Sequence, residues 1–155
     1  MPVMSSVTTL TKSTAVELQF ATFYVGELLL ALPIDYVQEI NRNLELTEIP
    51  HAPEHVRGVI NLRGDVATVI DLRRILGFSL AEVTPQSRNL IVRSGDESIG
   101  LWVDRIADII SITSDSICPA PANVSGADGR YFKGVYRNDS EIVVILDVQE
   151  VLDVE

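Results

Sequence analysis

The chain is poor in the residues that most metal and redox sites use. Among its 155 residues there are two histidines and a single cysteine, Cys118. One cysteine excludes an internal disulfide, which agrees with a reducing compartment. Structural zinc takes four ligands, mostly Cys and His, so these three side chains are too few to build such a site. We therefore expect no metal and no cofactor.

Positive charge is also scarce. The chain has 12 basic and 22 acidic residues, which gives a formal net charge of −10. Both halves are acidic: residues 1–85 carry six basic and ten acidic side chains, and residues 86–155 carry six and twelve. Nucleic-acid-binding domains are usually basic, so we expect no nucleic-acid partner.

Long apolar runs are absent. No stretch approaches the roughly 18 apolar residues of a membrane span, so we expect no direct membrane insertion. The first fourteen residues, MPVMSSVTTLTKST, lack the basic region and continuous apolar core of a secretory signal. Because they are polar and rich in Ser and Thr, we expect residues 1–15 to form a flexible leader.

Short runs rich in Val and Ile make up most of the chain. These two residues supply 34 of the 155 positions, and turn-forming pairs such as Gly64-Asp65 separate the runs. This pattern is typical of strands. It predicts strands over Val16–Val25, Glu27–Leu32, Tyr36–Ile40, Val56–Leu62, Val66–Asp71, Asn89–Arg93, Ser98–Val103, Ile106–Ile112, Tyr131–Tyr136 and Glu141–Leu146.

Only two segments favour a helix, residues 72–76 and 148–152. Each follows an aspartate, Asp71 or Asp147, a residue type that caps the first turn of helices. A duplicated aspartic protease would also place two aspartates at equivalent positions. The D-T/S-G turn of such enzymes is absent here, so helix capping is the favoured interpretation.

The two halves of the chain resemble each other. Shifted by 69 residues, Gly26–Ile40 matches Gly95–Ile109; shifted by 76, Gly58–Leu72 matches Gly134–Val148. Chance similarity between short strand–turn–strand segments is the alternative, but two blocks in the same order favour duplication. A twofold duplication is too short for a solenoid, which needs at least about three repeats.

The duplication predicts a mainly β protein with two small lobes of about five strands each. An open five-stranded sheet leaves reactive edges, so we expect each lobe to close into a small barrel. The polar stretch over residues 81–87 predicts the boundary, with lobe 1 over residues 16–85 and lobe 2 over residues 86–155. We expect a partner to bind in the groove between the lobes.

Candidate catalytic residues have simpler explanations. His51 and His55 are spaced as in a helical metal dyad, but Pro53 lies between them and the glutamate of H-E-x-x-H is misplaced. Cys118 has no basic neighbour to activate its thiol. The phosphate-binding, dinucleotide-binding and nucleophile-elbow motifs are absent. We therefore expect no enzyme activity, with a small acidic β-rich enzyme as the disfavoured alternative.

One segment reverses the acidic balance. Arg57, Arg63, Arg73 and Arg74 lie within eighteen residues that contain only two acidic side chains. Arg63 comes just before a glycine turn. It is either a surface residue paired with Asp65 or Glu39, or a guanidinium that fixes the turn or binds a carboxylate on a partner. The residues alone leave both interpretations open.

An ordered series of segments extends over nearly the whole chain, from about residue 16 to 153. In the first half these are residues 26–27, 30–34, 37–40, 49–53, 56–64 and 69–73, and in the second half residues 100–104, 117–121 and 133–135. No single short motif is decisive, but the series with its spacing resembles the CheW family, the coupling proteins of bacterial chemosensory arrays. The resemblance identifies residues 16–155 as a CheW-like domain.

This resemblance implies two SH3-like five-stranded barrels with a few short helices, and no catalysis. Members of the family are cytoplasmic adaptors recruited to membrane-associated receptor arrays. They bridge the cytoplasmic tip of a methyl-accepting chemoreceptor to the regulatory domain of a chemotaxis histidine kinase. Two alternatives within the resemblance are an adaptor of a non-flagellar motility or surface-sensing pathway, and the adaptor half of a coupling protein fused to a receiver domain.

The resemblance also implies site residues. Val37, Glu39, Gly58 and Arg63 would contact the receptor or support its groove; glycine at 58 would allow a partner helix or a neighbouring backbone to come close. The helical receptor tip would lie in an apolar groove. The kinase contact would include Ile117, Cys118, Ala122 and Asn123, on the segment over residues 117–123.

Overall fold

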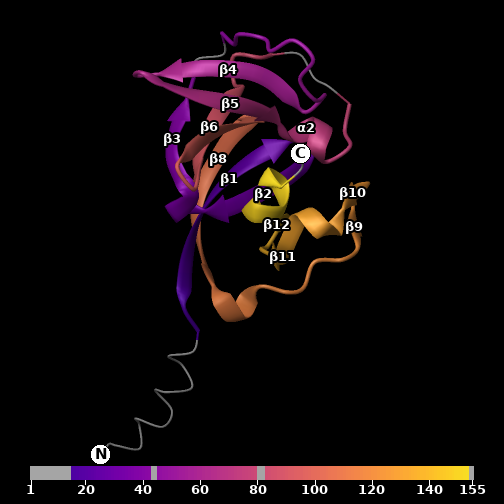
Figure 1. Ribbon diagram of the computed structural model, residues 1–155. Coiled ribbons are helices and arrows are strands. Elements are labelled where there is room, and N and C mark those ends of the chain that lie inside the picture. The colour runs from indigo at the N-terminus through magenta and orange to yellow at the C-terminus, as the bar shows by residue number, and fades with distance from the viewer. Residues whose placement is uncertain (1–14, 43–44, 80–82, 154–155) are drawn as a thin grey trace, which may run out of the picture.

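The computed structural model describes residues 15–42, 45–79 and 83–153 (Figure 1). Nearly all of the predicted leader, residues 1–14, lies outside the described part. The elements in chain order are β1 (Glu17–Val25), β2 (Leu28–Pro33), η1 (Ile34–Tyr36), β3 (Val37–Asn41), β4 (Val56–Leu62), β5 (Asp65–Asp71), α2 (Leu72–Ile75), β6 (Arg88–Ser94), β7 (Glu97–Val103), β8 (Arg105–Thr113), η2 (Ser114–Ser116), β9 (Asn123–Val124), β10 (Ala127–Asp128), η3 (Gly129–Tyr131), β11 (Phe132–Arg137), β12 (Ile142–Leu146) and α3 (Val148–Leu152).

The strands form two five-stranded sheets and one small hairpin. Sheet A has the order β11-β12-β2-β1-β8, sheet B has the order β3-β6-β7-β5-β4, and β9 pairs with β10. All ten predicted strands are present, each within one residue of its expected ends, and the fold class is confirmed as mainly β with short helices. Among the strands of the described residues, the prediction missed only β9 and β10, because two residues are too few to show an alternating pattern.

The predicted lobe boundary at residues 85 and 86 is wrong. Each sheet takes the first hairpin of one repeat and the last three strands of the other, so β1 and β2 lie with β8, β11 and β12, whereas β6 and β7 lie with β3, β4 and β5. Only Asp104 separates β7 from β8. A hairpin requires a loop of about two residues or more, so the chain cannot reverse here and passes instead into the other sheet.

The two sheets have equivalent pairings. β2 runs parallel to β12 in sheet A, as β7 does to β5 in sheet B. One isolated bridge curls each sheet toward a barrel: Thr47 bonds to Val59 in both directions at 2.9 Å, and Cys118 bonds to Val135 in both directions at 2.8 Å. Since Val59 and Val135 are themselves 76 positions apart, the geometry supports the duplication.

The main core lies between the two sheets. Its buried side chains come from both, among them Phe23, Leu30 and Leu146 of sheet A and Leu90 and Leu101 of sheet B. Each sheet also has one smaller apolar cluster of its own. It lies around Phe20 and Ile145 in sheet A, and around Val69 and Trp102 in sheet B. Burial of each large side chain contributes about 1.5–3 kcal/mol, so the shared core holds the sheets together as one unit.

Two aspartates cap the short helices, as predicted. The Asp71 side chain accepts a hydrogen bond from the Arg73 backbone N–H at 2.9 Å before α2, and Asp147 accepts one from the Glu150 N–H at 3.2 Å before α3. Asp71 is 1% exposed and also accepts a 2.9 Å hydrogen bond from Nε of Arg57. These contacts give both aspartates a structural role.

Within the described ranges, no helix is long and apolar enough to cross a membrane. The same residues contain no group of three or more His, Cys, Asp or Glu side chains arranged to hold a metal ion.

Candidate protein-binding site

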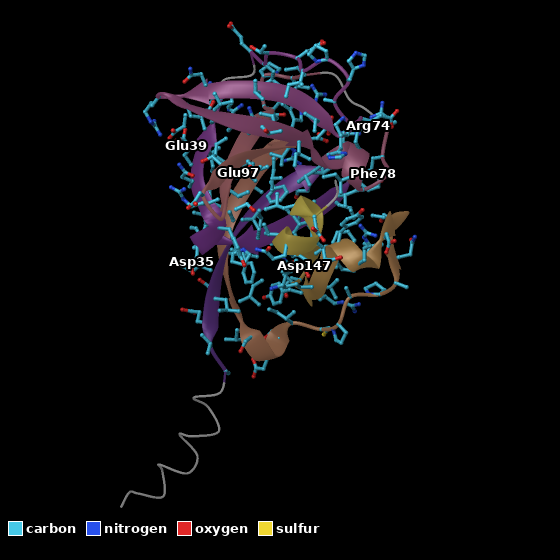
Figure 2. The ribbon with its side chains drawn as sticks, viewed as in Figure 1. Asp35, Glu39, Arg74, Phe78, Glu97 and Asp147 are labelled. Atoms are coloured by element: carbon cyan, nitrogen blue, oxygen red, sulfur yellow. The ribbon has the colours of Figure 1, made fainter. Side chains whose placement is uncertain are left out.

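An exposed ion pair joins the two edge strands of sheet B. Arg63 lies at the tip of the β4–β5 hairpin, and its Nη2 contacts Oε1 of Glu39 on β3. The Arg63 side chain is 79% exposed and that of Glu39 is 22% exposed. Figure 2 labels Glu39 close to this hairpin tip. Asp65 and Glu39 were the two carboxylates predicted as partners of Arg63, and the structure pairs it with Glu39.

The hairpin turn positions Arg63. Arg63 and Gly64 have φ angles of +50° and +98°, the left-handed conformations that a two-residue hairpin loop requires. Asn61 Oδ1 accepts a 3.0 Å hydrogen bond from the Gly64 N–H and fixes the turn. The turn therefore directs the arginine across the opening of the curled sheet toward β3.

Glu39 is held in its anionic form. Asn41 Nδ2 donates a hydrogen bond to Glu39 Oε2 at 3.1 Å, and Arg63 donates to the other oxygen. Although burial acts in the opposite direction, these hydrogen bonds and the Arg63 charge lower the pKa of Glu39 below its ordinary value of 4.5, and the Asn41 bond has the largest effect. At neutral pH the site therefore presents a fixed carboxylate beside an exposed guanidinium.

A bulge in β3 places apolar side chains on the opposite face. Val37 pairs with Val92 and Glu39 with Ile91, so Gln38 is the extra residue. Val37 and Ile40, opposite Val92 and Leu90, therefore share the face that meets the core between the sheets. Val37 is half-buried there, and Ile40 is 44% exposed.

Edge strand β8 of sheet A presents the equivalent pair. Ile106 packs against the same core as Val37, and Ile109 is 60% exposed. Ile106 and Ile109 lie 69 positions after Val37 and Ile40, the offset of the duplication. Sequence analysis did not select Ile40, Ile106 or Ile109, although applying that offset to Val37 would have found Ile106.

Gly58 lies on β4, next to the chain that follows β3. It is buried, its φ is +150°, and a Cβ at this position would lie 2.5 Å from the carbonyl oxygen of Thr47. Of the two explanations for glycine here, the close approach of a neighbouring backbone is the one the structure shows. Glycine at position 58 therefore allows the chain after β3 to lie against β4. These are the two edges of sheet B that Glu39 and Arg63 join.

A surface depression where the two sheets meet is polar, unlike the core between them. It has a volume of about 220 Å³ and is lined by Arg73, Asp104 and Arg105 among others, and none of the four predicted receptor residues lines it. Asp104 accepts hydrogen bonds from Arg73 Nε at 3.0 Å, from Arg73 Nη2 at 2.6 Å and from the Gly26 N–H at 2.7 Å. It therefore ties the β1–β2 turn of sheet A to α2, which follows sheet B.

The predicted kinase residues lie together on the segment that runs from the end of η2 to Asn123, the first residue of β9. Ile117 is half-buried against the sheet A cluster, whereas Cys118, Ala122 and Asn123 are exposed. The Ala122 carbonyl accepts a 2.7 Å hydrogen bond from the Gly129 N–H, and Asn123 Oδ1 accepts one from the Gly126 N–H at 3.0 Å. The segment is anchored through its backbone and Asn123, and presents an uncharged surface.

These features define a class of protein, a small β-rich binding module built from two interleaved SH3-like sheets. Its candidate binding surfaces include the edge strands of the sheets. The CheW-like domain model matches residues 19–155. The chain thus belongs to the CheW-like domain family, a family of scaffold and adaptor proteins, and the resemblance predicted from its segments is confirmed.

Individual relatives agree with this assignment. The chain is 34% identical to the chemotaxis protein CheW of Helicobacter pylori, over 87% of this chain and 81% of that protein. It is 30% identical to protein FrzA of Myxococcus xanthus, over 88% of this chain and 86% of that protein. The crystal structure of the scaffolding protein TtCheW from Thermoanaerobacter tengcongensis has a TM-score of 0.82 and 31% identity, with 90% of each chain covered.

Proposed function

We propose that this protein is a non-enzymatic adaptor that couples chemoreceptors to a chemotaxis histidine kinase in cytoplasmic arrays beneath the membrane. Membership in the CheW-like family supports the role. For the receptor tip we propose a surface on the edge strands: Val37 and Ile40 supply apolar contacts, Glu39 and Arg63 supply charge, and Gly58 supports them. A helical tip needs such a combination of an apolar strip and polar anchors.

One observation carries the assignment of Arg63 to function. The duplication places Asp108 and Asp139 in sheet A where sheet B has Glu39 and Arg63. Two carboxylates cannot form an ion pair, yet sheet A has the same strand pairing as sheet B. The fold therefore does not require the pair, and an exposed pair contributes less than about 1 kcal/mol to stability.

Replacement of Arg63 tests this role. We expect Arg63→Ala to lower receptor-dependent kinase activation about tenfold, equivalent to about 1.4 kcal/mol of coupling free energy. Its midpoint of urea unfolding should stay close to that of the wild type, because the pair is exposed. Kinase activity is measured in reconstituted receptor–kinase assemblies, and binding to the receptor tip is measured separately.

The matched control is Arg93→Ala, which removes an exposed arginine from β6 of the same sheet. We expect the control to activate the kinase like the wild type. Unchanged activation by Arg63→Ala would show that Arg63 is only a surface charge. Failure of the wild-type protein to bind either partner would contradict the adaptor role itself.

For the kinase we propose the segment of Ile117, Cys118, Ala122 and Asn123. Its exposed and uncharged surface suits an apolar contact. A second candidate function is the same adaptor role in a motility or surface-sensing pathway, which the similarity to protein FrzA favours. Pull-down with the kinases of both kinds of pathway distinguishes the two, because an adaptor should retain its own kinase and release the other.

A further inference from the structure

Two depressions occupy equivalent places on the two sheets. The first, of about 500 Å³, is lined by Glu27, Leu28, Asp139, Glu141, Ile142 and Val144, among others. The second, of about 200 Å³, is lined by Asp65, Val66, Thr68, Arg93, Asp96, Glu97 and Ser98. Offsets of 69 and 76 relate most of the second set to the first, so the two depressions lie at equivalent positions of the two repeats.

The two depressions have diverged in chemistry. In sheet A the floor of the depression consists of apolar side chains. Leu28 and Val144 are nearly buried there, and Ile142 beside them is 50% exposed. Glu97 and Thr68 stand at the positions equivalent to Leu28 and Val144 in sheet B, where only Val66, 63% exposed, remains apolar. Exposed apolar surface of this kind marks interaction sites.

The apolar depression borders the proposed kinase segment. Val124 and Ser125, which form part of its wall, directly follow Asn123, and the β9–β10 hairpin that carries Val124 lies at the same end of the molecule as β11 and β12 (Figure 1). Val124 also packs against the core between the sheets. A partner seated on residues 117–123 therefore has this depression within reach.

The charged side chains that line the sheet A depression are mostly acidic. Three carboxylates, Glu27, Asp139 and Glu141, face one guanidinium, Arg137. Within the described residues none of these three carboxylates forms an ion pair. The second depression is also acidic, with three carboxylates against Arg93. A second copy of this chain would bring acidic rims together, and like charges in contact disfavour a complex.

We infer that the sheet A depression binds an aliphatic side chain flanked by Lys or Arg, presented by a different protein. Resting on the proposed function, this inference assigns the depression to the kinase regulatory domain, whose contact would extend from residues 117–123 onto Ile142. The aliphatic side chain packs on Leu28, Ile142 and Val144, and the basic residue pairs with Asp139 or Glu27.

The duplication supplies a matched pair of variants. Ile142→Glu and Val66→Glu replace equivalent, half or more exposed side chains on β12 and β5. We expect Ile142→Glu to raise the Kd for the purified kinase regulatory domain at least tenfold in isothermal titration, and Val66→Glu to change it less than twofold. Far-UV circular dichroism and thermal unfolding should show that both variants fold. Equal Kd values for Ile142→Glu and the wild type, or equal losses in both variants, would overturn the inference.

Two further measurements test the rim and the occupant. Asp139→Lys should weaken kinase-domain binding and make it less sensitive to salt, because one ion pair is lost; an unchanged salt dependence would overturn the charge assignment. Sedimentation of the wild type should show no self-association, whereas self-association abolished by Ile142→Glu would identify a second copy as the occupant and overturn the inference. If the wild type binds no kinase domain at all, the proposed function fails as well.

Discussion

Gly58→Ala is expected to destabilise the protein by about 2–6 kcal/mol. Its added Cβ would lie 2.5 Å from the Thr47 carbonyl oxygen and 3.0 Å from the Thr47 carbonyl carbon, both of them backbone atoms. Relief requires the chain after β3 to move away from β4, which breaks the two 2.9 Å hydrogen bonds between Thr47 and Val59. Overpacking costs about 1–3 kcal/mol, and the φ of +150° adds about 1–3 kcal/mol for a residue with a side chain. Urea unfolding monitored by circular dichroism measures the loss.

Gly77→Ala is the control for this variant. Gly77 also has a positive φ, +83°, but nothing lies within 4 Å of the added Cβ. Its cost should be limited to the backbone term of about 1–2 kcal/mol. Equal destabilisation of both variants would show that the contact with Thr47 is unimportant and that Gly58 does not hold the edge of the site.

Asp104→Asn is expected to lower the free energy of unfolding at pH 7 by about 2 kcal/mol, the typical value for charge-assisted hydrogen bonds. The substitution removes the charge that pairs with Arg73 and weakens the bond from the Gly26 N–H, which together connect sheet A to α2. The matched control is Asp35→Asn, because Asp35 is the equivalent residue of the first repeat and is exposed on η1. We expect the control to change stability by less than about 0.5 kcal/mol. A similar effect of both substitutions would contradict a specific role for Asp104.

The same pair predicts a pH dependence. Burial acts to raise the pKa of Asp104, but the hydrogen bonds from Arg73 and Gly26 and the charges of Arg73 and Arg105 outweigh it and hold the pKa below the ordinary 3.8. A carboxylate with a lowered pKa stabilises the fold above its unfolded pKa and loses that contribution as the pH falls through the folded pKa. The stability difference between wild type and Asp104→Asn should therefore be constant near neutral pH and shrink below pH 3.8. A difference that persists unchanged at pH 2 would contradict this assignment.

Much of this protein could be predicted from the sequence alone because the determining interactions are local. Alternating Val and Ile with turn pairs set the ten strands, and Asp71 and Asp147 set the starts of both helices. The ordered segments identified the family. Glu39 was one of two carboxylates predicted to meet Arg63, because turn chemistry placed that arginine at a hairpin tip.

Only the tertiary structure decided which copy of the repeat each hairpin joins. Duplicated strands offer nearly identical partners, so their pattern is the same whether the halves fold separately or exchange hairpins. The exchange depends on the single-residue connection at Asp104 and on a core shared by both sheets. The bulge at Gln38, which turns Ile40 to the face of Val37, and the different chemistry around Ile142 and Val66 likewise depend on strand pairing. Such contacts join residues far apart in the chain, and local preferences carry no information about them.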